Sequence, residues 1–384
     1  MLLDYETLKL VWWLLIGILL IGFAITDGMD MGVGTLLPFI GRTDSERRVV
    51  INAIAPHWDG NQVWLITAGG AIFAAWPAVY AAAFSGFYLA MLLVLVALFF
   101  RPVGFDYRSK LEDARWRNAW DWALFAGGAV PALVFGIAFG NLLQGVPFHL
   151  DRFLRPQYEA TFIWALLGLL NPFALLAGLL SVAMLAVHGA TWLQLRTEDV
   201  IAERARAMIL LLAPVVAGLF ALAGIWVYLG VDGYRIVSQP PPGALPNPLA
   251  KEVVRAPGAL LDIYARAPLA LLAPALGLVG PFVVVALSRM RAAGLAFAAS
   301  ALSMAGIIAT AGLSMFPFIM PSSSRPGSSL TVWDASSSHL TLSVMFWAVA
   351  ILLPLVLAYT VWAYWAMWGK ITVKGIEQKP HDVY

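Results

Sequence analysis

The chain has 384 residues, of which 61% are hydrophobic and only 12% are charged, and its formal net charge is +2. This composition, with a mean hydropathy of +0.81, lies outside the range of soluble proteins and predicts an integral membrane protein. Because the charge is near balance and no basic cluster occurs, the sequence gives no support to nucleic-acid binding.

Apolar segments long enough to cross a bilayer recur along the whole chain. None alternates with a period of two, so the predicted fold class is all-α, with one transmembrane domain over residues 1–384. The first span has no small-residue cleavage site behind it and is expected to be retained. The nine predicted spans are 8–27, with a continuation to 40 left open, 49–76, 79–101, 121–143, 161–190, 207–229, 267–288, 293–315 and 339–368.

The two sides of such a helical protein differ in their content of lysine and arginine. Of the 24 Lys and Arg residues, 8 fall on the side of the N-terminus and 16 on the side of the C-terminus. Positive charge favours the cytoplasmic side. We therefore expect a periplasmic N-terminus, a cytoplasmic C-terminus and periplasmic loops at 230–266 and 316–338.

A polar segment, PHWDGNQVW at residues 56–64, interrupts the second apolar span. Helix rise from Arg47 places Asp59 about 16 Å into the membrane, near the middle of a hydrocarbon core of about 30 Å. A carboxylate there costs at least about 2.5–3.5 kcal/mol, so it is expected to face a bundle interior or a water-filled path. Two pairs share a helix face, His57 with Asn61 and Asp59 with Gln62. We interpret the segment as a protonatable lane, and the alternative is a structural polar knot between helices.

A second group of charges is expected at one membrane level on the cytoplasmic side. Asp27 and Asp30 lie at the far end of the first span, Arg101 ends the third span, and Asp121 begins the fourth. These charges could form either a salt-bridged collar or a proton entrance. The compact sequence TDGMDMG around the first two favours the proton entrance.

The residue types limit which cofactors this chain can hold. It has no cysteine, which excludes thiolate-bound iron–sulfur clusters and covalent c-type haem in this chain. A bis-histidine haem needs two imidazoles at matched depth, and only His57 is predicted to lie deep. We therefore predict no haem and no metal site. Most of the 16 tryptophans fit a membrane-interface belt, and Trp58 is the candidate for stacking with a quinone.

Several strings resemble subunit II of bacterial cytochrome bd-type ubiquinol oxidases, among them GFAITDGMDMGVG, INAIAPHWDGNQVWLITAGGAIFAAWP, FFRPVGFDYRSK and LTVWDASSSHLTL. The resemblance covers nearly the whole chain. It implies two four-helix bundles plus one helix in the bacterial inner membrane. The implied partners are the haem-bearing subunit I, one or more small single-helix accessory subunits, quinol and the lipid bilayer.

The resemblance further implies that haem b and haem d reside in subunit I, which oxidises quinol and reduces dioxygen to water without pumping protons. Subunit II is implied to stabilise the complex, to bind a quinone in some members and to contribute part of a cytoplasmic proton route. The implied route positions are Asp30, Asp59, Arg101, Asp121 and the terminal Tyr384, to which His57 and Gln62 are added from the polar segment.

Two other classes of function stay open. A pure scaffold would use its buried polar groups only to shield and assemble subunit I. An ion-coupled transporter would need discontinuous helices at corresponding places in two repeats, and the sequence shows no convincing pair.

Overall fold

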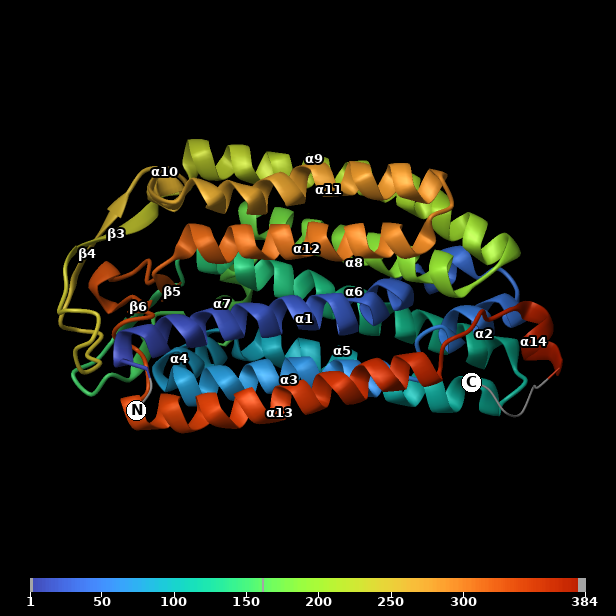
Figure 1. Cartoon of the computed structure of the whole chain (residues 1–384), viewed down its shortest axis with the longest axis horizontal. Helices are drawn as coiled ribbons and strands as arrows, with labels where there is room; N and C mark the ends of the chain where they lie inside the picture. The colour runs from blue at the N-terminus through green and yellow to red at the C-terminus, as the bar shows by residue number, and fades with distance from the viewer. Residues whose placement is uncertain (1–2, 161, 379–384) are drawn as a thin grey trace.

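The structure is a computed structural model that describes residues 3–160 and 162–378 (Figure 1). Eight of the helices in these residues are long and apolar enough to cross a membrane. They are α1 (Tyr5–Ile40), α5 (Tyr88–Tyr107), α6 (Ala114–Gln144), α8 (Pro172–Arg196), α9 (Asp199–Gly230), α11 (Leu272–Arg289), α12 (Ala293–Met315) and α13 (His339–Ala366). The predicted all-α membrane class is confirmed.

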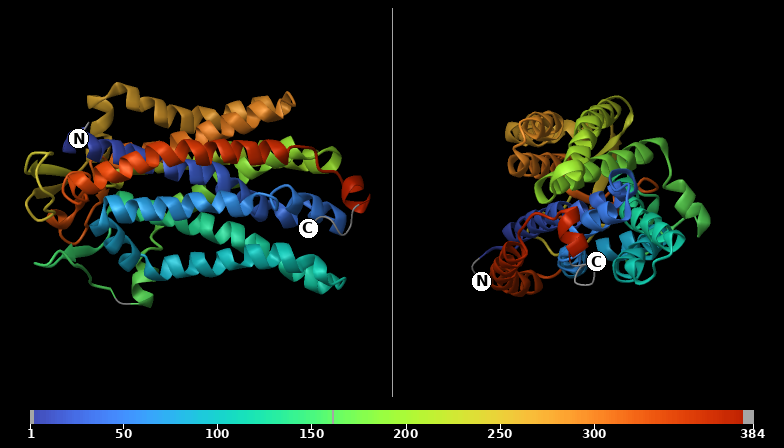
Figure 2. Two further views of the ribbon diagram at one scale, coloured as in Figure 1. Left: turned by 60° about the horizontal axis from the view of Figure 1, so that its bottom comes forward. Right: turned by 90° about the vertical axis from the view of Figure 1, so that its right-hand side faces the viewer.

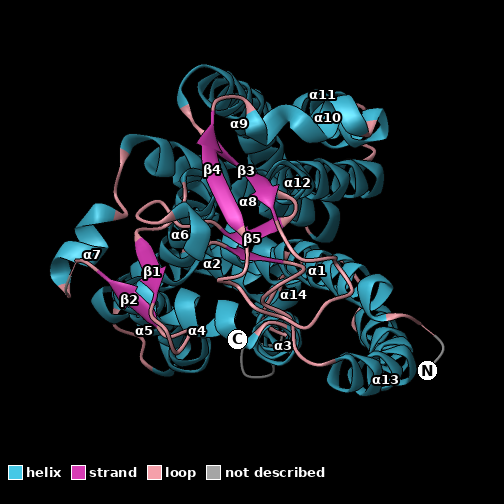
Figure 3. Cartoon of the chain, turned by 90° about the vertical axis from the view of Figure 1, so that its left-hand side faces the viewer, coloured by secondary structure: helices cyan, strands magenta, loops and turns pink. Residues whose placement is uncertain are grey.

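Other elements connect these helices. Helix α3 (Trp58–Ala75) has 18 residues, and the shorter helices are α2 (Asp44–Asn52), α4 (Pro77–Gly86), α7 (Ile163–Gly168), α10 (Asp262–Arg266) and α14 (Val373–Gln378). Three antiparallel strand pairs are β1 (Phe148–Leu150) with β2 (Pro156–Tyr158), β3 (Gly233–Ser238) with β4 (Glu252–Ala256), and β5 (Phe318–Met320) with β6 (Leu330–Thr331). The strands gather at the end of the molecule that carries the N-terminus (Figure 3). The opposite end carries α2 and α14, and we call it the α2 end (Figure 1).

The predicted second span, 49–76, is wrong as one continuous helix. Helix α2 ends at Asn52, residues 53–57 form turns, and α3 begins at Trp58. Pro56 explains the break, because proline lacks a backbone N–H and disfavours helical geometry in the residue before it. The helix rise counted from Arg47 therefore does not give the depth of Asp59, which lies in the first turn of α3.

Two further predicted spans are corrected, and in each a helix begins at a proline. The span predicted at 161–190 begins at Pro172, after the separate helix α7, and the Asn171 side chain caps it by accepting from the backbone N–H of Ala174 at 2.9 Å. The span predicted at 79–101 is divided at Phe87 into α4, which begins at Pro77, and α5. Proline is well suited to the first position of a helix, where its missing N–H costs nothing.

The long helices run side by side along the longest axis of the molecule (Figure 2). Helix α1 contacts α3, α6 and α8, and α6 and α8 also pack on each other. Helix α5 packs on α6, and α8 packs on α9 and α12. A Cβ added at Gly32 would overlap the carbonyl oxygen of Leu185, so the backbones of α1 and α8 lie in direct contact. Close approach through small residues is typical of membrane helices. The division into two four-helix bundles plus one helix stays a prediction.

The N-terminal end is tied to segments that come much later in the chain. The buried Lys9 ammonium donates to the carbonyl oxygens of Pro242 at 2.8 Å, Ala244 at 3.2 Å and Trp333 at 2.7 Å. The Tyr5 hydroxyl donates to the carbonyl oxygen of Ser337 at 2.6 Å. These bonds satisfy a buried cation without a carboxylate and close the 230–266 and 316–338 segments over α1.

Candidate functional site

Three charged side chains meet in the buried space between α1 and α5. The Arg101 guanidinium donates to both carboxylate oxygens of Asp27, Nη1 to Oδ2 at 3.0 Å and Nη2 to Oδ1 at 2.6 Å. Its Nη2 also lies 3.6 Å from Oδ2 of Asp30. All three side chains are at least 97% buried. Two carboxyls share one guanidinium, so the cluster can hold a proton without losing the two-bonded Asp27–Arg101 pair.

Neighbouring residues make room for this guanidinium. Gly127 on α6 faces Arg101, and a Cβ added there would lie 3.1 Å from Cγ of Arg101. The ring of Trp58 covers the guanidinium from the other side at 5.7 Å, within the range of a cation–π contact. An ionised pair that is removed from water needs such additional contacts to offset its desolvation.

Asp30 is linked through an amide to the last long helix. Its Oδ2 accepts from Nδ2 of Asn61 on α3 at 2.8 Å, and Oδ1 of Asn61 accepts from the Tyr364 hydroxyl on α13 at 2.6 Å. The His57 ring stacks on the Tyr364 ring at a centroid distance of 4.6 Å. Both ring nitrogens of His57 are buried and have no hydrogen-bond partner within residues 3–160 and 162–378.

A small cavity adjoins Asp30. It is lined by Asp30 and Arg101 together with apolar residues of α1, α2, α5 and α6, including Leu124. The volume open to the centre of a water molecule is about 10 Å³, so the cavity has room for roughly one water. Oδ1 of Asp30 is buried and accepts no hydrogen bond from the described part of the chain. A buried carboxylate oxygen beside a space of this size is suited to bind water.

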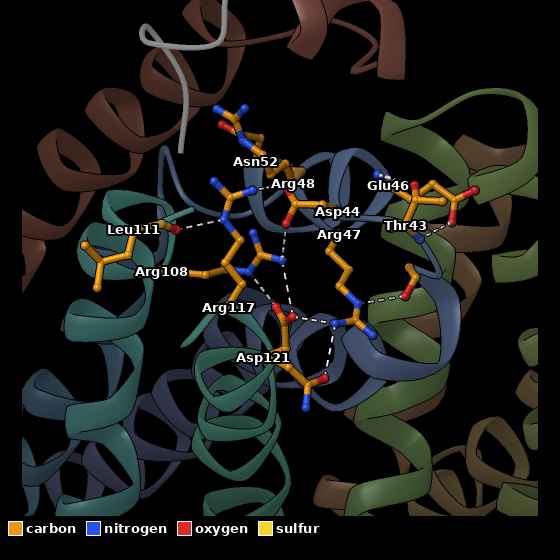
Figure 4. A network of polar contacts seen from close by, with 12 residues as sticks. Thr43, Asp44, Glu46, Arg47, Arg48, Asn52, Arg108, Leu111, Arg117 and Asp121 are labelled. Carbon is orange, nitrogen blue, oxygen red and sulfur yellow. Dashed lines mark hydrogen bonds and ion pairs between the residues drawn. The ribbon is translucent and has the colours of Figure 1, made fainter. Parts of the chain in front are cut away.

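Asp121 belongs to a different cluster, at the α2 end (Figure 4). Its Oδ1 accepts from Nε of Arg108 at 2.6 Å, and its Oδ2 accepts from Nη1 of Arg47 at 2.7 Å and from Nη2 of Arg108 at 3.2 Å. Asp44 at the start of α2 joins Arg108 at 3.0 Å and Arg117 at 2.7 Å. Both oxygens of Asp121 are therefore occupied by guanidinium groups.

The structure unites some of the predicted site residues and separates others. Asp30 and Arg101 meet, as the depth argument expected, but Asp121 contacts arginines other than Arg101. His57 and Asn61 both point inward, as the shared face predicts, while Asp59 is exposed and Gln62 is half-buried. Asp59 therefore lies outside the interior of this chain, and its expected place in a bundle interior or a water-filled path stays a prediction. Tyr384 lies outside the described residues.

Three residues that contact the predicted site residues were not identified from the sequence. Arg108 follows Arg101 by seven residues in FRPVGFDYR, and this two-turn spacing places both on one helix face. That spacing was the available signal for Arg108. Arg47 and Tyr364 carried no such signal, because one lay in an interfacial run of charges and the other in an interfacial run of aromatics.

A large apolar cavity of about 690 Å³ lies among α1, α6, α8, α9, α11 and α12. Phe23, Phe135 and Phe220 contribute to its walls, and Tyr264, whose hydroxyl is 2.9 Å from that of Ser314, lies at its edge. Trp58 is not among its lining residues. Within the described residues, no three His, Asp or Glu side chains converge as a metal site.

Comparison with known proteins gives a consistent result. Residues 8–367 match the family model described as cytochrome bd terminal oxidase subunit II. The chain is 58% identical to cytochrome bd-I ubiquinol oxidase subunit 2 of Escherichia coli strain K12, over 99% of this chain and 100% of that one. It is 31% identical to cytochrome bd ubiquinol oxidase subunit 2 of Bacillus subtilis, over 94% of this chain and 96% of that one.

A solved structure supports the same fold. The chain aligns with a chain of the bd oxidase from Geobacillus thermodenitrificans at a TM-score of 0.68, over 94% of this chain and 99% of that one. The sequences are 18% identical. The likeness therefore concerns the arrangement of helices alone.

Proposed function

Because this chain belongs to the cytochrome bd terminal oxidase subunit II family, we propose that it carries protons to the haem-bearing subunit I of a quinol oxidase complex. In this proposal haem b and haem d are held by subunit I, which oxidises quinol and reduces dioxygen to water. This chain holds no haem and supplies part of the route from the cytoplasm, without pumping. Small single-helix accessory subunits complete the complex in the bacterial inner membrane.

The observation that carries the proposal is the unpartnered oxygen of Asp30 beside the small cavity. The cavity also contacts Leu124, which lies three residues after Asp121 on α6 and therefore about one helical turn away. One water in this cavity would extend the polar contacts of Asp30 toward the α2 end. The excess of carboxyls over guanidiniums around Arg101 gives this position the capacity to bind a proton.

The proposed route has its mouth at Asp121 and its exit at Asp59. The α2 end is cytoplasmic in this proposal, because the count of lysine and arginine favours that orientation. Asp59 is exposed on this chain in the first turn of the apolar helix α3, where contact with lipid would be costly. We therefore place Asp59, with Gln62, against subunit I. His57 and Tyr384 remain proposed members of the route.

A bound quinone is the second part of the proposal. The apolar cavity of about 690 Å³ has the size and lining that an isoprenoid quinone requires, with Phe23, Phe135 and Phe220 to hold it. Trp58 is less suited, because its ring covers Arg101. Solvent extraction of the purified complex should yield quinone. Phe220→Trp narrows the cavity and should lower the amount of quinone extracted, and an unchanged amount would contradict this placement.

The scaffold function also has an observation in its favour. The two hydrogen bonds between Arg101 and Asp27 are well formed and fully buried, as a purely structural tie would be. A scaffold predicts that loss of a buried carboxyl reduces haem content or assembly. A proton route predicts that turnover falls in a complex that assembles normally.

The deciding experiment measures quinol oxidase turnover and the reduced-minus-oxidised haem spectrum of Asp30→Asn and Asp59→Asn. Each variant keeps the size of the side chain and removes the proton-binding carboxyl. We expect turnover to fall by about tenfold or more, as for loss of a proton-transferring group, with the spectrum unchanged. The matched control is Asp232→Asn, in the connection before β3. Normal turnover in both variants would sink the proton-route proposal, and loss of haem would favour the scaffold.

A further inference from the structure

We infer that Tyr364 and Asn61 form a positioning pair that fixes the orientation of the Asp30 carboxyl. This inference rests on the proposed proton route and adds to it a residue of the last long helix. Tyr364 lies near the end of α13, a helix of 28 residues in which only Leu342 is fully buried. Its hydroxyl nevertheless turns inward and donates to Oδ1 of Asn61 at 2.6 Å.

The Tyr364 hydroxyl and the Asp30 carboxylate together set which way the Asn61 amide faces. An amide presents one acceptor oxygen and one donor nitrogen. With the oxygen occupied by the Tyr364 hydroxyl, the nitrogen faces Asp30 and donates to its Oδ2 at 2.8 Å. The reversed amide would place its oxygen against a carboxylate oxygen, and two acceptors repel. By donating to the amide oxygen, the Tyr364 hydroxyl stabilises the orientation in which the nitrogen faces Asp30.

A fixed Oδ2 also fixes the other oxygen of the carboxyl. Oδ2 of Asp30 lies between Nδ2 of Asn61 at 2.8 Å and Nη2 of Arg101 at 3.6 Å. Oδ1 is then the oxygen left to bind water in the adjoining cavity. If the amide reverses, Oδ2 loses its donor and the carboxyl can rotate away from this arrangement. The expected consequence is slower proton delivery with an intact fold.

Tyr364 acts in this arrangement through Asn61, because an amide separates its hydroxyl from the carboxyl. The charged groups that act on Tyr364 are Asp27 and Asp30 on α1 and Arg196 at the end of α8, and the His57 ring stacks on it. Phenylalanine at this position keeps the stacked ring and removes only the hydroxyl. Tyr364→Phe is therefore a selective test.

The experiment compares Tyr364→Phe in the assembled complex with Tyr359→Phe, a control that removes a hydroxyl from an exposed position of the same helix. We expect Tyr364→Phe to lower turnover about two- to tenfold, the range set by one hydrogen bond. The haem spectrum and the KM for quinol should not change. The kinetic solvent isotope effect and the pH profile of turnover should change, because proton delivery becomes more limiting. Tyr359→Phe should leave all five of these quantities unchanged.

A double variant separates this inference from the proton-route proposal. In the Asn61→Ala background, Tyr364→Phe should cause no further loss, because the amide through which it acts is gone. Additive losses would overturn the inference, as would wild-type turnover and isotope effect in Tyr364→Phe while Asp30→Asn is slow. Normal turnover in Asp30→Asn would overturn the proton route itself, and this inference with it.

Discussion

The clusters around Asp30 and Asp121 use the same residue types but pair them in opposite proportions. Around Asp30, two carboxyls share the single guanidinium of Arg101, and one carboxylate oxygen has no partner in the described chain. Around Asp121, one carboxyl receives hydrogen bonds from Arg47 and Arg108 on both oxygens. A carboxyl saturated by guanidiniums is an anchor, whereas one that shares a guanidinium keeps the capacity to bind water or a proton.

The largest expected effect comes from removing the only cation of the Asp30 cluster. Arg101→Met leaves two buried carboxyls without a counter-charge, and such a change costs about 3–5 kcal/mol. Thermal unfolding of the purified complex and its yield from membranes measure the loss. Arg291→Met is the matched control, because Arg291 is 74% exposed and its ion pair with Glu203 is expected to matter little. A wild-type melting temperature for Arg101→Met would show that the carboxyls are protonated without it.

A smaller effect is expected from Asp121→Asn. The amide keeps an accepting oxygen, and Arg108 retains Asp44 at 3.0 Å, so the loss should be about 1.5–3 kcal/mol in stability. Turnover of the assembled complex should fall less than in Asp30→Asn. If turnover falls as much as in Asp30→Asn while the melting temperature stays at the wild-type value, Asp121 transfers protons as Asp30 does. The two clusters then do not differ in function.

The smallest effect is expected at an ion pair in the 230–266 segment, which serves as a solvent-exposed reference for both clusters. Arg235 donates to Asp262 at 2.7 and 2.8 Å and holds the pKa of this carboxyl below its ordinary value. A lowered pKa in the folded state means that the contribution is complete above about pH 4 and is lost as the pH falls through the lowered value. Asp262→Asn should therefore lower the melting temperature by about a degree at pH 7 and by less in acid. An effect that grows in acid would reverse this assignment.

The sequence predicted the helical architecture well because apolar length is a property of each segment alone. Every predicted span contains a helix, and the errors lie at Pro56, Phe87 and Pro172, where proline or a local turn ends a helix inside an apolar run. Counting helix rise along α1 also correctly predicted that Asp30 and Arg101 lie at the same depth in the membrane. Both predictions rest on quantities that can be counted along the chain.

The direction in which a polar side chain points could not be predicted by counting residues along the chain. Asp59 and Asn61 are two residues apart, about 200° around a helix, so one must turn outward when the other turns inward. The polarity of the segment does not say which of them faces α1. The inward choice of Asn61 depends on Asp30 and on Tyr364 of α13, more than 300 residues away. The same dependence on distant partners hid Arg47 and its contact with Asp121.

The bonds of Lys9 have a consequence for how the chain is made. Its ammonium emerges from the ribosome early, yet its three carbonyl partners belong to residues 242, 244 and 333, which are synthesised 233 to 324 positions later. Until these residues have been synthesised the three acceptors are absent, and the ammonium is solvated by water and by the Tyr5 ring, whose centroid lies 4.0 Å from it. A truncated product ending before Trp333 lacks the third of these acceptors. The full set of three bonds can therefore form only after Trp333 has been synthesised.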